Sequence, residues 1–557
     1  MAKIPILRFN GMNNVVHPEE LPLDKASDCV DVQFTNNSEL LIPGREYSKI
    51  LTVATAHSVN NSDVGLFYCD DTSLLRYVSD VSQVELIADT GGDPIEYSTP
   101  IGDTVYFSNG TVSGKLKTGS NVVKEWGVDV PPSTFTLAEI GSGGMYAAKY
   151  RIAITWIGDT ESGTTNSKSI TIGEGSGIRI TNLPTPPSYA TKFAVWCSSH
   201  EGQDLLLYNE YAIATTSVDI SKFKSKIVLD TMQMYPPLPP VGSPIMQHYG
   251  RIYWAEGSIL RFTHVGPFGP QYELTGPWLY HGPFDNSDIL IYVSVPGAIY
   301  VGTEQAIYRI TNIDSPDQTP IIIDPILNVG AVKGAACYDQ NGSDAFFVTH
   351  RGIIKVSPEG HSEITFKDVA MPFYESGTMS VEYLAGLRYL TFVGYNGASN
   401  PMANSEWLST QTFPQDSGWR VNLETGAISR FTAGSINRLS NQYGTDDTGL
   451  LKLIDYRESA TGRYTTGRID FGSSLQKRLP YCYVTHNGKT LNFEATDDIG
   501  PIDYEIPETT RREVVKIDDM ARGASGQYWQ FSISNKTGKA AVVTEIEPRI
   551  ITIPRHR

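Results

Sequence analysis

Short acidic motifs are the first places where this sequence could do chemistry. Asp89-Thr90-Gly91 matches the tripeptide of aspartic proteases, whose mechanism needs two such carboxylates sharing one proton. Taken as a solitary match, it predicts an ordinary turn between strands. Asp339-Gln-Asn341-Gly-Ser-Asp344 spaces its oxygen ligands somewhat as the start of a calcium loop does, yet it lacks the closing bidentate acid and the flanking helices. A hairpin turn is the favoured interpretation there too.

The remaining motifs point away from catalysis. Gly173-Glu-Gly-Ser-Gly177 has neither the P-loop lysine nor a following helix, so it predicts a flexible loop. The ten histidines are dispersed without an HxH or HExxH pair, and His350-Arg351 predicts an exposed hairpin turn. Asp416-Ser-Gly-Trp419 approaches the repeated sialidase turn only once and out of register. We therefore predict a protein that is not an enzyme, with no catalytic residue, no metal site and no cofactor.

The elements that would position any site are strands. Apolar residues alternate with period two almost everywhere, and sustained helical periodicity is nearly absent. Near the start, Val30, Val32 and Phe34 alternate before a turn at Asn36-Asn37, and a second strand ends at Pro43-Gly44. We therefore predict an N-terminal arm with a hairpin over residues 1–60.

A repeat of strand, polar turn and strand is the most informative pattern. Its starts are about 47, 47 and 43 residues apart, a period typical of propeller blades. Four clear copies lie at 250–262, 297–310, 344–356 and 387–431. Two similar units lie earlier in the chain, at 64–78 and 102–116, and a final fragment lies at 449–456. The repeat predicts a β-propeller of six or seven blades, with blades over 61–130 and 241–463.

Two segments break this rhythm. Pro131-Pro132 opens and a Pro-rich run at 236–240 closes a stretch with alternating strands at 150–156 and 192–197. Its length and turn spacing predict an inserted immunoglobulin-like or fibronectin-III-like sandwich over residues 131–240. Residues 464–557 alternate again and predict a C-terminal β-sandwich. The predicted fold class is all-β.

Composition limits the function classes. The 557 residues are 40% hydrophobic, 10% aromatic and 19% charged, which excludes a disordered chain. A net charge of −17 argues against a dedicated nucleic-acid binder, but it suits a channel through which DNA passes without sticking. Five isolated cysteines predict reduced, mostly buried thiols. We expect a soluble chain with no signal peptide and no membrane span.

Motifs at the two ends of the chain resemble one family. The opening Phe9-Asn-Gly-Met-Asn-Asn14 and Leu40-Leu-Ile-Pro-Gly-Arg45, and the closing Thr465–Gly472, Lys477-Arg478 and Gly523–Asn535, look like short-tailed bacteriophage tail-hub proteins. These proteins are also called nozzle, tail tubular or DNA stabilisation proteins. The order of blades, inserted sandwich and further blades is similar to theirs as well, so the resemblance touches nearly the whole chain.

The resemblance implies a structural role in the virion. Such proteins form a homohexameric tube below the portal and the head-to-tail adaptor. The tube retains the genomic DNA, conducts it during ejection without sequence-specific binding, and anchors tail fibres, spikes or a needle. The expected location is the viral tail, assembled in the host cytoplasm. The resemblance assigns no residue to the channel wall, and the identities of the partners and the host stay open.

Two rival hypotheses remain at this point. The first is a glycan-binding or receptor-binding β-propeller that acts at the host surface, where some of the 30 Tyr and 8 Trp would contact sugars. The second is a glycosidase built on the propeller, which would need two carboxylates facing each other across a pocket. Sequence spacing neither shows nor excludes such a pair.

Overall fold

The computed structural model is nearly all strand. In the described residues it contains 47 strands and one helix, α1 (Ser405–Thr410). The structure describes residues 1–557 apart from 1, 4, 7, 80–81, 127–129, 159–160, 189, 223–238, 267–268, 273–278, 314–320, 340–342, 364–367, 385, 411–416, 433–434, 455–460, 519–524, 537–539 and 554–557. With six residues, α1 is far shorter than the ~20 that a membrane-spanning helix needs, and the described part of the chain offers no other candidate.

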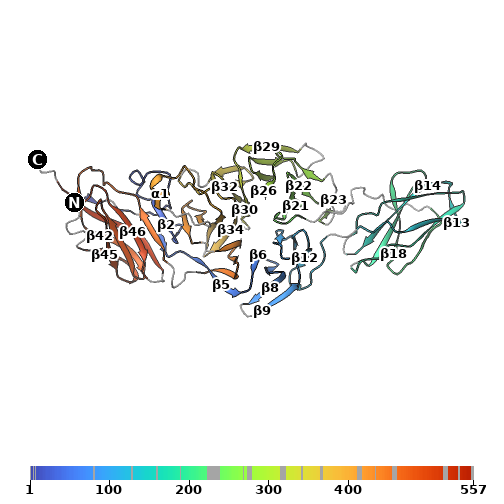
Figure 1. Cartoon of the computed structure of the whole chain (residues 1–557), viewed down its shortest axis with the longest axis horizontal. Coiled ribbons are helices and arrows are strands. Elements are labelled where there is room, and N and C mark those ends of the chain that lie inside the picture. Colours follow the sequence, from blue (N-terminus) through green and yellow to red (C-terminus); the bar gives the residue numbers. More distant parts are fainter. Residues whose placement is uncertain are drawn as a thin grey trace. The chain divides into compact units, whose positions relative to one another are not determined.

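The chain divides into two compact units. Unit 1 comprises Met1–Pro94 and Phe284–Arg557, and unit 2 comprises Ile95–Pro283. Small antiparallel sheets of the kind that form propeller blades occur in both units (Figure 1). The prediction of an all-β fold is confirmed.

Unit 1 contains five blade-like groups of four strands; three are separate sheets, and the other two, the third and fourth below, are parts of one continuous 13-stranded sheet. Each is built from strands that are near neighbours in the chain, apart from β5, which joins the last sheet. The first sheet is β6 (Ala56–Ser62), β7 (Gly65–Asp70), β8 (Ser73–Ser79) and β9 (Ser82–Ile87). The second is β26 (Ile289–Val295), β27 (Ala298–Thr303), β28 (Ile307–Thr311) and β29 (Ile322–Leu327). The third is β30 (Ala331–Tyr338), β31 (Ala345–Thr349), β32 (Gly352–Ser357) and β33 (Gly360–Glu363).

The last two of these sheets follow in the chain. One is β34 (Ser376–Leu384), β35 (Leu387–Tyr395), β36 (Ser417–Asn422) and β37 (Ile428–Phe431). The other is β38 (Ile436–Ser440), β39 (Tyr443–Asp446), β40 (Gly449–Ile454) and β5 (Glu46–Thr52). In unit 1, β26 contacts β30, β34 contacts β38, and β38 contacts β6, so successive sheets lie side by side. The pairing of β5 with β40 joins residues about 400 positions apart.

Unit 2 contains two further blade-like sheets and a two-stranded ribbon. The first sheet is β10 (Glu96–Tyr97), β11 (Thr104–Ser108) and β12 (Ser113–Lys117). The second is β20 (Met246–His248), β21 (Arg251–Glu256), β22 (Ile259–Phe262) and β25 (Tyr280–His281), and the ribbon is β23 (His264–Gly266) with β24 (Gly269–Gln271). All seven repeats expected from the sequence thus contain paired strands in the part of the chain that the structure describes.

The inserted segment of unit 2 is a sandwich of three strands on four. One sheet is β13 (Thr136–Met145), β16 (Ser176–Thr181) and β19 (Val218–Ile220). The other is β15 (Lys168–Ile172), β14 (Ala148–Ile157), β17 (Lys192–Ser198) and β18 (Leu205–Ala212). The alternating Tyr150, Ile152 and Ile154 all enter its core, as period-two patterning requires. The Pro-rich run expected to close this segment begins among residues 236–238, which lie outside the described residues.

The C-terminal sandwich is built from both ends of the chain. One sheet orders β3 (Gln33–Phe34), β4 (Leu40–Ile42), β47 (Ala541–Thr552), β42 (Lys477–Gly488) and β45 (Thr509–Ile517), with β1 (Ala2–Lys3) beside β47. The other orders β2 (Ala26–Val30), β41 (Arg463–Thr466), β46 (Gln530–Asn535), β43 (Leu491–Thr496) and β44 (Pro501–Ile506). The prediction of an N-terminal arm over residues 1–60 was wrong. That segment contains the predicted hairpin, β3–β4, but β1–β4 are part of this sandwich, and β5 and β6 belong to blade-like sheets.

Candidate functional site

A pocket at one end of the inserted sandwich is the first candidate site. Its volume is about 520 Å³, within the ~300–1,000 Å³ range of small-molecule sites. Two loops form its walls, the segment 182–186 after β16 and the segment 213–216 after β18. The inner side belongs to β14 and β17. The pocket therefore lies where the two sheets end and two connections converge.

The inner side of this pocket is apolar and firmly held. Ile154, Trp156 and Phe193 line it, and each is at most 5% exposed. The register of β14 with β17 sets Trp156 opposite Phe193. Phe193 stacks on Tyr211 of β18, with ring centroids 5.5 Å apart and an interplanar angle of 24°. These rings form a wall that core packing holds in place before any ligand arrives.

The walls and rim add proline rings and small polar groups. Pro184 and Pro186 lie on one side, and Thr215 and Thr216 lie on the other. Asn182 has φ 51° and donates its amide N–H to the Thr136 hydroxyl at 3.0 Å, which orients the amide at the rim. Asn tolerates this left-handed conformation better than most residues. None of the twelve lining residues carries a charge.

A second pocket of about 540 Å³ follows the edge strand β18. Lys192 and Glu210, which both line it, form an ion pair at 3.0 Å. Tyr211 of β18 also lines this pocket. Burial raises the pKa of the Tyr211 hydroxyl above its usual value, so the phenol stays protonated and can donate a hydrogen bond at neutral pH.

The acidic motifs of the sequence form turns. Asp89 accepts a hydrogen bond from Gly91 N at 2.9 Å, and Thr90 donates its hydroxyl to Thr72 O at 2.8 Å. The treatment of this tripeptide as solitary was wrong, because Asp447-Thr448-Gly449 repeats it at the β39–β40 turn. There the Thr448 amide donates to Asp446 at 2.9 Å. Both tripeptides therefore serve as strand connections, as predicted for the first.

The calcium-like segment has its end carboxylates occupied by cations of the chain itself. The fully buried Asp339 carboxylate pairs with Arg388 at 2.9 Å, and Asp344 pairs with Lys355 at 2.7 Å. Asp339 N donates to Asp344 O at 3.0 Å, which closes the predicted hairpin. The middle of the segment, residues 340–342, lies outside the described residues.

The remaining predicted positions are structural where the structure describes them. Gly173–Gly177 connects β15 to β16, and His350-Arg351 connects β31 to β32, as expected. Trp419 is 1% exposed and donates its indole N–H to the Tyr374 hydroxyl at 2.6 Å, which makes it a core residue of β36. Asp416 lies outside the described residues.

The five cysteines are free thiols, and four of them are buried. Burial raises the pKa of Cys29, Cys197 and Cys482 far above the usual thiol value, which keeps them protonated and unreactive. The prediction of reduced, mostly buried thiols agrees with this arrangement.

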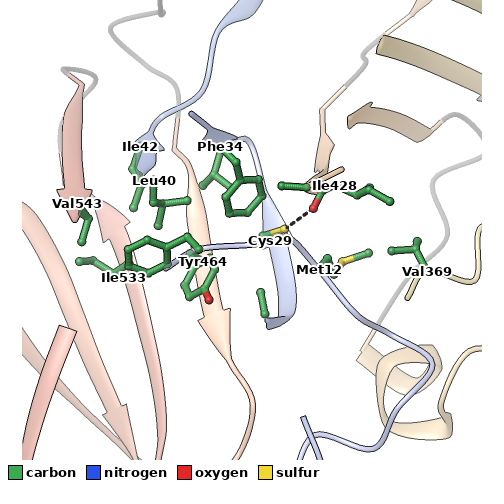
Figure 2. Packing of buried hydrophobic residues seen from close by; sticks show 14 of the residues in the cluster. Met12, Cys29, Phe34, Leu40, Ile42, Val369, Ile428, Tyr464, Ile533 and Val543 are labelled. Carbon is green, nitrogen blue, oxygen red and sulfur yellow. Dashed lines mark hydrogen bonds between the residues drawn. The ribbon is translucent and has the colours of Figure 1, made fainter. Parts of the chain in front are cut away.

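A second candidate is the place where the two motif-bearing ends of the chain meet. We call it the terminal joint, and it comprises β1–β4 with β41, β42, β46 and β47. Strand β2 pairs with β41 of the sandwich and, through Val30 and Arg430, with β37 of the neighbouring blade-like sheet. The Cys29 thiol donates to Ile428 O at 3.5 Å (Figure 2). One N-terminal strand thus links the sandwich to that sheet.

Side chains reinforce this link on both sides of β2. Asp28 pairs with Arg430 at 2.7 Å, towards the blade-like sheet. Ser27 donates to Thr466 O at 2.8 Å, and Gln530 donates to the same carbonyl at 2.8 Å, towards the sandwich. Figure 2 shows Met12, Cys29, Phe34 and Tyr464 in the shared core. The rings of Phe9 and Tyr464 pack edge to face, with centroids 5.1 Å apart. The link is therefore a packed interior and not a hinge.

Comparison with known proteins adds little to this geometry. No family model matches the chain, and neither does any curated protein. A glycoside hydrolase family 43 arabinoxylan arabinofuranohydrolase from Bacillus subtilis is similar at 11% identity, over 74% of this chain and 96% of that one, with a TM-score of 0.18. PorZ, a surface component of the type-IX secretion system of Porphyromonas gingivalis, is similar at 10% identity over 86% and 96%, with a TM-score of 0.17.

A third solved structure is the extracellular domain of a hybrid two-component system from B. thetaiotaomicron. Its identity is 10%, its coverage is 76% of this chain and 51% of that one, and its TM-score is 0.23. These proteins are a glycoside hydrolase, a surface component of a secretion system and an extracellular domain, and none of them is described as a tail protein. At such TM-scores the likenesses carry no argument about function.

Proposed function

We propose that this chain is a structural protein of a short-tailed phage tail, a hub or nozzle subunit that assembles into a homohexameric ring. The observation that carries the proposal is the terminal joint. The sequence motifs that resemble tail-hub proteins lie more than 400 residues apart, at 9–45 and 465–535. Where the structure describes them, residues of both sets of motifs form strands of one sandwich or pack into its core. Motifs from both ends of the chain that meet in one place support a shared architecture more than scattered matches would.

The residues of these motifs have specific structural tasks. The side chain of Asn14 makes two hydrogen bonds to the backbone of Ala370, at 2.7 and 3.0 Å. Lys477 is fully buried, and its ammonium donates to Leu475 O at 2.8 Å and Gln527 O at 2.9 Å. A buried ammonium or amide group is tolerated only where its polar atoms have hydrogen-bond partners that replace water. The motifs therefore specify a rigid body, which suits a ring that must resist the pressure of packaged DNA.

The charge of the chain fits the same role. At −17 per subunit, a hexamer would carry a net charge of about −100, and an acidic lumen repels DNA so that it slides during ejection. In this proposal the partners are further copies of the chain, the head-to-tail adaptor, and fibre, spike or needle proteins. The location is the virion tail, after assembly in the host cytoplasm.

Negative-stain electron microscopy of the purified full chain tests the proposal. The chain is imaged alone and mixed with the head-to-tail adaptor from the same genome. Rings with an open centre in either sample are the expected result. Separate single-subunit particles in both samples would contradict the tail-hub function.

Recognition of a host-surface glycan is a second candidate function. The pocket of the inserted sandwich favours it, because the pocket combines an aromatic inner side with hydroxyl and amide groups. A sedimentation assay of the full chain with purified host polysaccharide tests this candidate, and we expect the chain to co-sediment. A chain that stays in the supernatant with every host polysaccharide would count against it.

A further inference from the structure

We infer that the pocket between segments 182–186 and 213–216 binds an uncharged saccharide unit. The inference rests on the second candidate function. It places the glycan-binding site in the inserted sandwich, whereas the hypothesis drawn from the sequence places that site on the β-propeller. The charge of the lining is the first step. The chain carries 61 acidic and 44 basic residues, yet none of the twelve residues lining this pocket is charged. A neutral lining selects a neutral ligand, since an ionic one would lose its hydration without a partner.

The distribution of polar groups is the second step. An apolar surface lies deep in the pocket, formed by Trp156 and Phe193, whereas Asn182, Thr185 and Thr216 are at the exposed rim. A sugar ring presents C–H groups on its face and hydroxyls around its edge. A ligand of that kind places its face against the inner side and its hydroxyls at the amide and hydroxyl groups of the rim. An aliphatic ligand would offer those amide and hydroxyl groups no hydrogen-bond partner.

Rigidity is the third step. The Phe193–Tyr211 stack and the strand register fix the inner side, and two prolines restrict the 182–186 segment. The Asn182 amide is already oriented by its bond to Thr136. Because these groups are ordered before binding, a small ligand does not have to supply the cost of ordering them. The exposed Tyr146 lies just before the start of β14, at the other end of the sandwich, and is therefore not part of this pocket.

Two variants of the full chain test the inference without removing core residues. Ala214→Trp fills the pocket from an exposed wall position. Asn182→Gly removes the rim amide, and glycine accepts the φ of 51° without strain. Asn396→Gly is the matched control, since Asn396 has φ 54° on an exposed turn of unit 1. Tyr146→Ala controls for an exposed aromatic residue of the same sandwich, 67% exposed.

The probes are maltose, cellobiose and N,N′-diacetylchitobiose, and ligand-observed NMR measures their binding to the full chain. We expect at least one to bind, with affinity lowered about tenfold or more by Ala214→Trp and severalfold by Asn182→Gly, and with both controls unchanged. Circular dichroism verifies that each variant is folded.

Three results would overturn the inference. The first is no binding of any probe to the unaltered chain. The second is binding that Ala214→Trp leaves intact, which would place the site elsewhere. The third is displacement of the sugar by a neutral Pro-rich peptide that binds more tightly, which would assign the pocket to a protein partner. Polysaccharide co-sedimentation that survives Ala214→Trp would preserve the second candidate function while removing this site.

Discussion

Single residues decide whether the N-terminal segment can pack against β37 of the neighbouring blade-like sheet. Gly11 has φ 89°, a conformation that side chains rarely adopt, and a Cβ added there would overlap the backbone nitrogen of Ile428. The next residue, Met12, donates its amide to Ile428 O at 2.9 Å. The two backbones must therefore approach closely at this crossing, and only glycine permits it.

Gly11→Ala is expected to lower the free energy of unfolding by about 2 kcal/mol or more, because backbone strain and a steric clash add together. Urea denaturation of the full chain measures the loss. Gly426→Ala is the control, since Gly426 has φ 72° with open space where the Cβ would lie. Equal losses of unfolding free energy in the two variants would mean that the close approach to Ile428 does not contribute to the effect of Gly11→Ala.

Two buried histidines in unit 2 make stability depend on pH. His248 and His281 are 3% and 5% exposed, and burial lowers the pKa of each from 6.5 to about 4, with Arg251 adding like-charge repulsion. The unfolded chain takes up these protons near pH 6.5, whereas the folded chain resists them until about pH 4. The stabilisation is therefore present above pH 6.5 and is lost as the pH falls through that interval.

His281→Phe is expected to reduce the loss of unfolding free energy between pH 7 and pH 4.5 by about 2 kcal/mol relative to the unaltered chain. Phenylalanine suits the site, because His281 lies 4.7 Å from Phe262 and 6.2 Å from Tyr253 between ring centroids. Denaturant titrations at the two pH values give the comparison. The exposed His200→Phe serves as the control and should leave the pH dependence as it was.

At the scale of elements, the N-terminal segment is interior structure. Phe9, Met12, Phe34 and Ile42 are each at most 2% exposed, in the same core as Tyr464. Deleting residues 1–45 would therefore uncover the core of the C-terminal sandwich, besides removing any contact with a neighbouring subunit. Loss of virion incorporation in that deletion would not by itself reveal a docking arm.

Phe9→Ala is expected to cost about 3–5 kcal/mol of unfolding free energy, as aromatic truncations in packed cores do. Ile499→Ala is the matched control in the same sandwich, since Ile499 is 81% exposed on the β43–β44 turn, and it should change stability by less than about 0.5 kcal/mol. Thermal and urea unfolding both report the difference. A Phe9→Ala chain as stable as the control would contradict the interior role of this segment.

The sequence predicted what local patterns can encode. The hairpins at 64–78, 250–262 and 297–310 were found because strand, turn and strand are contiguous, and they correspond to β7–β8, β21–β22 and β27–β28. The pairing of β5 with β40 and of β2 with β41 was not foreseen. These paired strands are far apart in the chain. Alternation of apolar residues identifies a strand, but it does not show which other strand pairs with it.

The candidate pocket was missed for a related reason. The alternating strands at 150–156 and 192–197, which contain Trp156 and Phe193, were both recognised, but as separate elements. The pocket exists only because the ends of β16 and β18 bring two loops together over β14 and β17. A buried Trp in an alternating strand gives no signal that one side of it lines a cavity.

At the scale of the whole molecule, charge opposes assembly in the proposed ring. Subunits that each carry −17 repel one another, and salt screens that repulsion over a Debye length of about 10 Å at 0.1 M. Stability of the single chain and stability of the ring should therefore respond differently to ionic strength.

Raising NaCl from about 20 mM to about 300 mM is expected to increase the fraction of the full chain in rings, by screening like charges. Mass photometry at fixed protein concentration measures that fraction, and potassium glutamate in place of NaCl controls for a specific effect of chloride. Rings that dissociate on addition of salt would instead indicate that ion pairs between subunits dominate the interface.

The pairing of N-terminal strands with β47 delays the completion of the C-terminal sandwich during synthesis. Strand β1 and the β3–β4 hairpin join β47, whose residues 541–552 are made roughly 500 residues after β4. At ~5–20 residues per second, the ribosome needs about 25–100 s to make that intervening length. During that interval, Phe9, Met12 and Phe34 emerge without the core that will cover them. These apolar side chains are therefore exposed to aggregation until β47 has been made.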